Sequence, residues 1–376
     1  MAKKVTDKIS QDKLSGKVYK IFDITRQESS FITILAFLIF VCGVVTPYPQ
    51  VAMWVGFMLA AYSAIANDSI QTIGTFIASN QKKKWWVLWL FIGGIFVATI
   101  SYSFVVYDGD VSFQRLSSKG FSEAPSSFTF LQLSAPLFLL ILTRLRMPVS
   151  TTFLLLNVFA TDANAIWSVM EKSFTGYVIA FLCAVAVWFV VGLFVKKYFK
   201  GKPWKYWIVI QWVTSGCLWS VWIQQDAANI AIFLPRNLDF MQFLAFTTFI
   251  FLGLGLLFYL KGDKIQRVVD EKSGVTDVRA ATIVDFVYAI ILFYFKTINT
   301  IPMSTTWVFI GLLGGRELAI SLSKRRKKKR ARSLRKSVKM VRKDLMNATI
   351  GLIISLILAI AINKNIQEEV LNYFFP

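Results

Sequence analysis

The sequence predicts an all-α polytopic membrane protein. Of its 376 residues, 56% are hydrophobic and 17% are charged, whereas soluble domains average roughly 45–50% and about 25%. Apolar runs of about 17–25 residues, the length that crosses a bilayer as a helix, recur along the chain. A soluble globular protein is therefore excluded. A disordered chain is excluded as well, because it would lack the apolar surface that this sequence has in excess.

About eleven membrane-spanning helices are expected. We place them near residues 31–46, 51–79, 85–106, 127–143, 148–170, 175–195, 204–234, 239–260, 281–298, 302–321 and 347–363. Two of them, 51–79 and 204–234, are too long for one crossing and carry polar side chains midway, so broken helices at the midplane are expected there. The first thirty residues contain no apolar run, which makes the first span a retained anchor rather than a cleaved signal peptide.

Basic residues predict the orientation. They collect in the N-terminal segment and at residues 82–84, 144 and 146, 196–205, 261–279 and 324–343. All of these sites fall on one side when eleven crossings are threaded, and cytoplasmic loops are the ones that carry such an excess. We therefore expect a cytoplasmic N-terminus, a C-terminus outside, and an integral protein of the plasma (inner) membrane.

Two short motifs each occur twice, in the same order. The first is ANDSIQTIGT at 66–75 and QQDAANIAI at 224–232, and the second is PVSTTFLLL at 148–156 and PMSTTWVFI at 302–310. The threading sends the two copies of each motif through the membrane in opposite directions. The sequence therefore predicts two inverted-topology repeats, an architecture that places a binding site near the bilayer midplane.

The repeats and the charge pattern divide the chain. The expected parts are a cytoplasmic segment 1–30, a first half 31–195 with repeat 51–170, a second half 196–321 with repeat 204–321, a basic cytoplasmic segment 322–346, and a last helix with a short tail, 347–376. The basic run Lys324–Lys343 is expected to contact anionic lipid headgroups rather than nucleic acid, because it lies between two spans.

The paired motifs resemble those of the inorganic phosphate transporter (PiT) family, including its sulfate permease-like members. That family carries two GANDVANA-type signatures and two Pro-x-Ser-Thr-Thr segments in inverted repeats. The signatures resemble Ala66–Thr75 and Gln225–Asn229 of this chain, and the Pro-x-Ser-Thr-Thr segments resemble Pro148–Thr152 and Pro302–Thr306. This chain departs from the pattern with Gln71 and Gln225 in place of signature Asn residues, and with Phe153 and Trp307 in place of the His that often follows Ser-Thr-Thr. The resemblance implies oxyanion transport coupled to sodium or protons.

Hydroxyl groups are the candidate anion ligands. These are Ser150, Thr151 and Thr152 in the first repeat and Ser304, Thr305 and Thr306 in the second. Pro148 and Pro302 favour a helix start at each segment, and a helix N-terminus offers unpaired N–H groups and a favourable dipole to an oxyanion. We expect the two segments to face an anion from both halves.

Intramembrane carboxylates are the candidate coupling groups, because a charge at midplane depth is costly and usually functional. Asp68 and Asp226 are expected to bind sodium or to carry protons, with Asn67, Gln71, Gln225 and Asn229 completing an oxygen shell. The chain has no His and its three Cys are scattered, so no transition-metal site is expected. The roles of Asp162, Asp285 and Glu317 stay open at this point.

These observations favour a secondary transporter that moves an inorganic oxyanion, most readily phosphate, with sodium or protons. A sulfate permease on the same scaffold is one alternative. An uncoupled anion channel or a membrane-embedded binding or sensor protein is another. An enzyme is not expected, nor is any cofactor other than sodium as a co-substrate, and a homodimer stays open.

Overall fold

A computed structural model describes residues 28–118, 120–145, 149–198, 201, 203–260, 278–298, 300–324 and 327–374. The side chains of residues 69–71, 191–198, 364, 365, 370, 373 and 374 lie outside this description. So do the expected N-terminal segment up to residue 27, Arg146, Pro148 and the basic loop 261–277. Every structural statement below concerns the described part of the chain.

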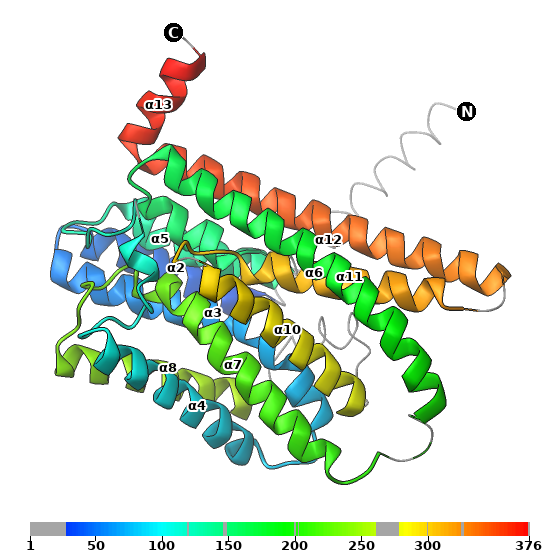
Figure 1. The fold of residues 1–376 in the computed structure, drawn as a ribbon. Coiled ribbons are helices and arrows are strands. Elements are labelled where there is room, and N and C mark those ends of the chain that lie inside the picture. The colour runs from blue at the N-terminus through cyan, green and yellow to red at the C-terminus, as the bar shows by residue number, and fades with distance from the viewer. Residues whose placement is uncertain are drawn as a thin grey trace, which may run out of the picture.

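The described chain is built of helices and contains no strand (Figure 1). The helices are α2 (Ser29–Val45), α3 (Pro49–Ser79), α4 (Trp85–Val106), η1 (Arg115–Ser117), α5 (Phe130–Arg144), η2 (Thr152–Leu156), η3 (Asn157–Phe159), α6 (Ala163–Tyr198), α7 (Trp207–Ala231), α8 (Phe240–Tyr259), α10 (Val278–Ile298), α11 (Thr305–Leu322), α12 (Lys327–Ile362) and α13 (Lys364–Phe374).

Six of the described segments are long and apolar enough to cross a membrane: Pro49–Asp68, Trp85–Val106, Ala163–Val190, Phe240–Tyr259, Val278–Ile298 and Lys327–Ile362. Ser29–Val45 and Phe130–Arg144 are shorter apolar helices. Large apolar side chains such as Phe37, Phe40 and Ile357 are exposed on these helices, as a lipid-facing surface requires. The protein is thus an all-α polytopic membrane protein, as predicted, although fewer helices meet these criteria than the eleven expected crossings.

The expectation of broken helices at 51–79 and 204–234 is wrong. α3 and α7 run through Asp68 and Asp226 without interruption. The helices stay intact because side chains from other segments bond to the two carboxylates, so no backbone amide has to open toward them. The irregular backbone lies instead at the Ser-Thr-Thr segments, where η2 is a π-helical turn followed by a 3-10 turn, and where residues 301–304 precede α11 without helical structure.

A second correction concerns 148–170 and 175–195, which were expected to be two crossings. The structure has a short helical arm at 151–159 and then one continuous helix, α6. Residues 171–174, which separated the two expected crossings, are part of this helix. Lys172 is buried and donates to the carbonyl of Ile301 at 2.5 Å, so its ammonium group is not directed to bulk water.

The two repeats run in opposite directions. Asn80, just after α3, donates to Gln211 near the start of α7 at 2.9 Å, and Trp212 donates to Asn80 at 3.0 Å. At the other end of the molecule, Leu238 after α7 donates to the carbonyl of Gly109 after α4 at 2.9 Å. The end of one repeat helix therefore lies beside the start of its counterpart, as inverted repeats require.

The ends of the molecule differ in charge. Lys82 and Lys205 are exposed at the end where α3 finishes and α7 begins, which we call the basic end. The loops 107–129 and 232–239 form the opposite end, where Arg236 donates to the carbonyl of Phe121 at 3.1 Å. Two helices start there with a capping box, α5 at Thr129 and α8 at Asp239, which satisfies N–H groups that the helix leaves unpaired.

Cysteine labelling checks this topology. In a cysteine-free background, Lys82→Cys and Lys205→Cys are expected to react with a membrane-impermeant maleimide from the same side of the membrane, and Ser126→Cys from the other. All three residues are exposed and lie outside the helices. Labelling of positions 82 and 205 from opposite sides would contradict the inverted arrangement.

Packing places the second Ser-Thr-Thr helix inside the fold. α11 packs along α6 and also against α12, α4 packs against α8, and α3 against α7 (Figure 1). α12 is one helix of 36 residues, so the basic segment 322–346 continues from residue 327 directly into the last apolar span. The first residues of α11 are buried, and α11 also contacts α3 and α7.

Candidate functional site

The two Ser-Thr-Thr segments begin in the same way. Ser304 is the N-cap of α11, and its hydroxyl accepts from the Trp307 amide at 3.2 Å. The Ser150 hydroxyl likewise accepts from the Phe153 amide at 3.1 Å. Both serines, which were expected to bind an anion, thus use their oxygens as helix caps. Pro302 lies two residues before the cap rather than in the first turn.

Reciprocal hydrogen bonds join the two segments. Thr152 donates to the carbonyl of Met303 at 3.1 Å, and Thr306 donates to the carbonyl of Val149 at 3.3 Å. The two bonds are equivalent, because Thr152 corresponds to Thr306 and Val149 corresponds to Met303 in the two repeats. Phe153 and Trp307, also at equivalent positions, meet edge to face with ring centroids 5.8 Å apart. The segments are therefore related by a local pseudo-twofold axis.

Each buried carboxylate accepts from the threonine of its own repeat. Thr151 donates to Oδ2 of Asp68, and Thr305 donates to Oδ2 of Asp226 at 2.5 Å. Asp68 and Asp226 are 1% and 2% exposed, so these bonds replace water that the carboxylates have lost. Because the threonines occupy equivalent positions in the two repeats, the same pair of groups is built twice.

Further bonds cross between the halves. Thr306 shares its single hydroxyl hydrogen between the Val149 carbonyl and Oδ1 of Asp68, each at 3.3 Å. The amide of Asn229 donates to Thr151 at 3.3 Å and to Thr152 at 3.2 Å. The expected anion ligands and the expected coupling groups therefore form one cluster. We call this set the central cluster: Asn67, Asp68, Thr151, Thr152, Gln225, Asp226, Asn229, Thr305 and Thr306. The side chain of Gln71 lies outside the described residues.

The two halves of the central cluster differ in their unused acceptors. Oδ1 of Asn67 accepts from Thr143 at 3.2 Å. Within the described residues, Oε1 of Gln225 and Oδ1 of Asn229 are buried and accept no hydrogen bond. Their amide nitrogens donate to the carbonyl of Leu292 and to Asp226, which fixes which atom of each amide is the oxygen. The two unpaired oxygens belong to residues one turn apart on α7, and that of Asn229 lies on the side chain that bonds to Asp226.

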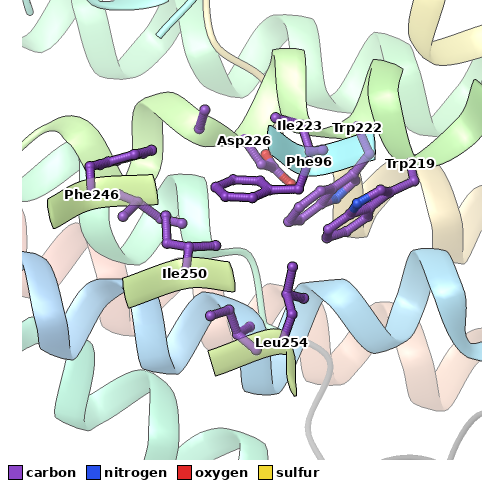
Figure 2. Close-up of a pocket in the computed structure, with 11 residues that line it drawn as sticks. Phe96, Trp219, Trp222, Ile223, Asp226, Phe246, Ile250 and Leu254 are labelled. Carbon is purple, nitrogen blue, oxygen red and sulfur yellow. The ribbon is translucent and has the colours of Figure 1, made fainter. Parts of the chain in front are cut away.

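A small pocket lined by Asp226 and otherwise by apolar side chains lies among α3, α4, α7 and α8. Figure 2 shows Asp226 among Phe96, Trp222 and Ile223, with Trp219 stacked on Trp222 at a centroid distance of 4.8 Å. The cavity is about 20 Å³, room for little more than one water molecule. Asp226 therefore combines polar partners, Thr305 and Asn229, with an apolar pocket wall.

Two buried basic residues near the central cluster were not singled out from the sequence. Arg115 in η1 is 1% exposed, and burial lowers the pKa of Arg115 to about 10 while the nearby Asp226 carboxylate opposes that shift. The guanidinium is still protonated at neutral pH. No sequence pattern marks Arg115, which lies in a loop. Lys172 would have been conspicuous as a cation within a long apolar helix had α6 been predicted as one helix.

The remaining intramembrane acids have structural partners. Asp162 accepts from the Ala165 amide at 2.8 Å and so caps the start of α6. Asp285 is 1% exposed and accepts from Thr75 at 2.6 Å and from Ser215 at 2.5 Å. It ties together α3, α7 and α10, and within the described part of the chain it forms no hydrogen bond with the central cluster.

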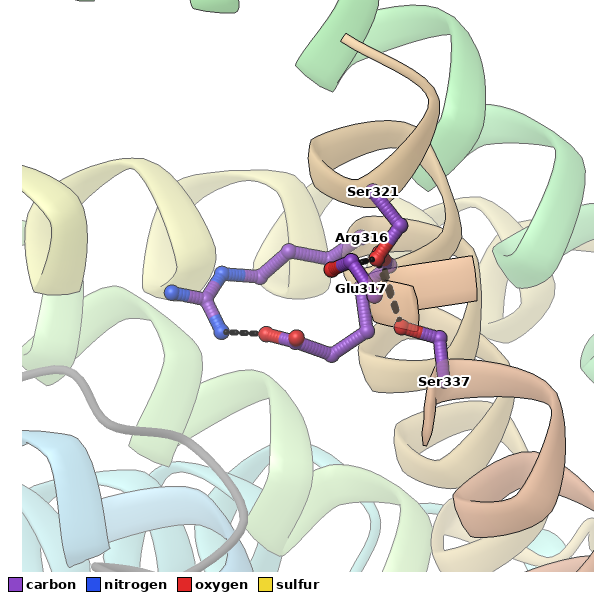
Figure 3. Close-up of polar contacts among 5 residues, drawn as sticks. Arg316, Glu317, Ser321 and Ser337 are labelled. Atoms are coloured by element: carbon purple, nitrogen blue, oxygen red, sulfur yellow. Dashed lines mark hydrogen bonds and ion pairs between the residues drawn. The ribbon is translucent and has the colours of Figure 1, made fainter. Parts of the chain in front are cut away.

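Glu317 forms an ion pair with its neighbour Arg316 at 2.9 Å, and Figure 3 shows this pair beside Ser321 and Ser337. Ser337 of α12 donates to the Glu317 carbonyl at 3.3 Å and lies 2.8 Å from the Ser321 hydroxyl. Arg316 is buried, with its guanidinium 5.5 Å from the Trp188 ring centroid. The group joins α11 to the basic part of α12.

The fold and the central cluster define a class: a polytopic membrane protein whose inverted repeats meet at buried carboxylates and threonines. Among solved structures, one described as "The sodium-dependent phosphate transporter" is similar to this chain, with 19% identity, coverage of 82% of this chain and 98% of that chain, and a TM-score of 0.46. No family model matches the chain, and no curated protein does.

Proposed function

We propose that this protein is a secondary transporter that moves an inorganic oxyanion, with phosphate as the substrate, together with sodium or protons. One observation carries the proposal. Two Ser-Thr-Thr segments from opposite halves meet at a pseudo-twofold axis, and each presents a threonine hydroxyl to a buried carboxylate. A binding site between inverted repeats is what alternating access needs, and transport requires no covalent step.

The hydroxyl groups supply a physical route to coupling. A threonine hydroxyl has one hydrogen, and while Thr305 donates it to Asp226 that hydrogen is not available to an anion. A sodium ion or a proton on Asp226 neutralises the carboxylate, and the hydroxyl can then turn its hydrogen toward an oxyanion. The same holds for Thr151 and Asp68. Cation binding thus prepares the anion site.

The cation is proposed to bind in the second half of the central cluster. Asp226 provides a charge, and the unpaired oxygens of Gln225 and Asn229 lie on the same face of α7. Carboxylate and amide oxygens suit a hard cation. Among the described side chains the first half offers less, because Asn67 already uses its oxygen to accept from Thr143.

Phosphate is favoured over sulfate by the carboxylates. Hydrogen phosphate keeps one O–H group that can donate to the carboxylate that carries no cation, whereas sulfate has no hydrogen and would leave that carboxylate facing an anion. Unpaired or repelling buried groups are costly. A sulfate permease on this scaffold is therefore the second choice.

Orientation and location follow from charge. With the basic end in the cytoplasm, the N-terminus is cytoplasmic and the C-terminus lies outside the plasma (inner) membrane. The exposed basic residues at the start of α12, which include Lys327, Lys328 and Arg332, are then placed to contact anionic headgroups.

Uptake into proteoliposomes tests the proposal. Labelled phosphate is expected to accumulate when a sodium or proton gradient points inward, and unlabelled sulfate is expected to compete weakly. Uptake that needs neither gradient would favour an uncoupled channel instead. Saturable binding without any uptake would favour a binding or sensor protein.

Thr305→Val tests the coupling group. Valine keeps the shape and removes the hydroxyl, so phosphate affinity is expected to fall by about 1–3 kcal/mol. Thr75→Val is the matched control, since Thr75 makes the same kind of bond to a buried carboxylate, Asp285, at 2.6 Å. Phosphate affinity, measured by titration of the purified protein in sodium, should fall only in the first variant. Equal losses in both would assign Thr305 a structural role.

A further inference from the structure

A larger pocket lies behind the two Ser-Thr-Thr segments and has a volume of about 260 Å³. If each non-hydrogen atom takes the roughly 30 Å³ of a liquid water molecule, about nine such atoms fit. The pocket is therefore large enough for a small organic molecule. We call it the lateral pocket. Its wall includes Phe153 of η2, Trp167, Glu171 and Phe174 of α6, Trp307 of α11 and Leu352 of α12.

The exposed rim of the lateral pocket faces the bilayer. Trp167 and Phe174 are 64% and 56% exposed, and both lie on Ala163–Val190, a segment long and apolar enough to cross a membrane. Glu171 comes eight residues after Ala163, which is roughly 12 Å along a helix that rises about 1.5 Å per residue. A molecule that enters the pocket therefore comes from the lipid phase.

Glu171 gives the rim a negative charge. Its side chain is exposed, and no basic side chain in the described part of the chain forms an ion pair with it. A carboxylate within a membrane span is costly and usually has a function. Trp167 and Phe174 lie about one turn before and after Glu171 on the same face of α6. A carboxylate between aromatic rings suits an organic cation, which gains an ion pair and cation–π contacts.

The inner wall of the lateral pocket contains an unused hydrogen-bond donor. Trp307 is 6% exposed, and its indole N–H has no hydrogen-bond partner within the described part of the chain. A buried donor without a partner is costly, so an oxygen acceptor on a bound molecule would be stabilising. Phe153 and Leu352 make the neighbouring wall apolar.

We propose that the lateral pocket binds an amphipathic amine that arrives through the bilayer. The ammonium group of this ligand pairs with Glu171, an oxygen acceptor of the ligand meets the Trp307 N–H, and an apolar body fills the space between them. The carboxylate disfavours anions, and the aromatic wall disfavours amines without an apolar body. Binding of the amine does not depend on the proposed transport function.

An occupant of the lateral pocket would also affect the central cluster. Phe153 and Trp307 directly follow Thr152 and Thr306, and their rings meet edge to face. A bound amine contacts both rings and restrains the movement of one Ser-Thr-Thr segment against the other. Alternating access needs such movement between the repeats. The amine is therefore expected to slow phosphate uptake, a consequence that rests on the proposed function.

Amine binding is tested with para-methoxyphenethylamine, which carries an ammonium group, an aromatic ring and an ether oxygen. Binding of the radiolabelled probe to the purified full chain in lipid nanodiscs is measured by equilibrium dialysis. Glu171→Gln is expected to weaken binding about tenfold or more, as the loss of a charge-assisted hydrogen bond implies. Glu123→Gln, which removes an exposed carboxylate in the loop 107–129, should stay within about twofold of the wild type. The uncharged para-methoxyphenethyl alcohol should compete at least tenfold more weakly than the amine.

A second comparison isolates the Trp307 N–H. Trp307→Phe keeps an aromatic ring and removes the donor, so it should weaken para-methoxyphenethylamine by about three- to tenfold. The analogue para-ethylphenethylamine has nearly the same shape and no oxygen, and its affinity should change by less than about twofold. A merely structural role of Trp307 would weaken both amines equally. If Trp307→Phe does not fold, Glu171→Gln decides the matter, because the Glu171 side chain is exposed.

The outcomes separate this site from the transport proposal. Absence of saturable amine binding, equal competition by the alcohol, or equal affinities of Glu171→Gln and Glu123→Gln would each overturn the amine site and leave the transport proposal standing. Amine binding by a protein that transports no oxyanion would leave the site standing and overturn transport. Where both hold, phosphate uptake by Glu171→Gln should need about tenfold more amine for inhibition than uptake by the wild type. Uptake that is unchanged at saturating amine would overturn the effect on transport alone.

Discussion

Asp226→Asn is expected to abolish sodium-driven phosphate accumulation while leaving folded protein in the membrane. Asparagine keeps an oxygen ligand and the size of the side chain, but it removes the charge that offsets cation desolvation. Removing one partner of a buried ion pair costs about 3–5 kcal/mol, which corresponds to roughly a hundredfold or greater loss of sodium affinity. Uptake into proteoliposomes at several sodium concentrations measures this loss.

Asp285→Asn is the matched control for that experiment. Asp285 is as buried as Asp226 and also accepts from two side chains, at 2.6 and 2.5 Å, but it bonds to Thr75 and Ser215 rather than to the Ser-Thr-Thr segments. The sodium dependence of phosphate uptake by Asp285→Asn is expected to match that of the wild type. Phosphate exchange at zero gradient adds a second readout, because a proton-coupled carrier with Asp226→Asn would lose accumulation and keep exchange. Unchanged gradient-driven uptake in Asp226→Asn would favour a channel or sensor.

The repeated motifs allowed the sequence to predict which residues come together. Asp68 and Thr151 are 83 positions apart, and Asp226 and Thr305 are 79 apart, yet each pair is bonded in the structure. The duplication explains this success. Two copies with the same motif order and nearly equal spacing are expected to adopt similar folds, so equivalent residues make equivalent contacts. The inversion could be predicted as well, since basic loops fix the direction of each crossing.

The position of the irregular backbone could not be predicted from polarity. Asn67, Asp68 and their counterparts on α7 suggested broken helices, but their polar groups find partners in side chains of other segments, such as Thr143, Thr151 and Thr305. A single sequence does not reveal such partners. The irregular backbone lies instead at 152–160, where a π-helical turn and a 3-10 turn lead to the extended residue Ala160. Irregular helical turns of this kind are frequent at functional sites.

The buried Arg115 shows another limit of sequence reasoning. Arg115 lies within a polar loop that has no distinguishing motif. Its burial results from contacts with Gln224 and Ile301, which are more than one hundred positions away. Hydropathy describes the neighbourhood along the chain, whereas a buried charge in a loop is decided by tertiary packing. Only the three-dimensional structure places Arg115 beside the central cluster.

The second large effect is expected at the contact between α6 and α11. A Cβ atom added to Gly311 would lie 2.4 Å from the carbonyl oxygen of Tyr177, and one added to Gly315 would lie 2.2 Å from that of Phe181. Both obstacles are backbone atoms, which cannot turn aside as a side chain can. Small residues four positions apart permit this close approach of membrane helices.

Gly315→Ala is therefore expected to destabilise the protein by about 3 kcal/mol or more, at the upper end of overpacking costs. The helices must separate, and α11 carries Thr305 and Thr306 at its start, so the surviving folded protein should also bind phosphate more weakly. Gly94→Ala is the control, because an added Cβ there meets no atom within 4 Å and alanine favours the helix. Thermal unfolding in detergent, followed by size-exclusion chromatography, compares the two variants. Equal unfolding temperatures of Gly315→Ala and Gly94→Ala would contradict the close contact. A lower unfolding temperature of Gly315→Ala alone would establish that the backbones of α11 and α6 pack directly against each other at Gly315.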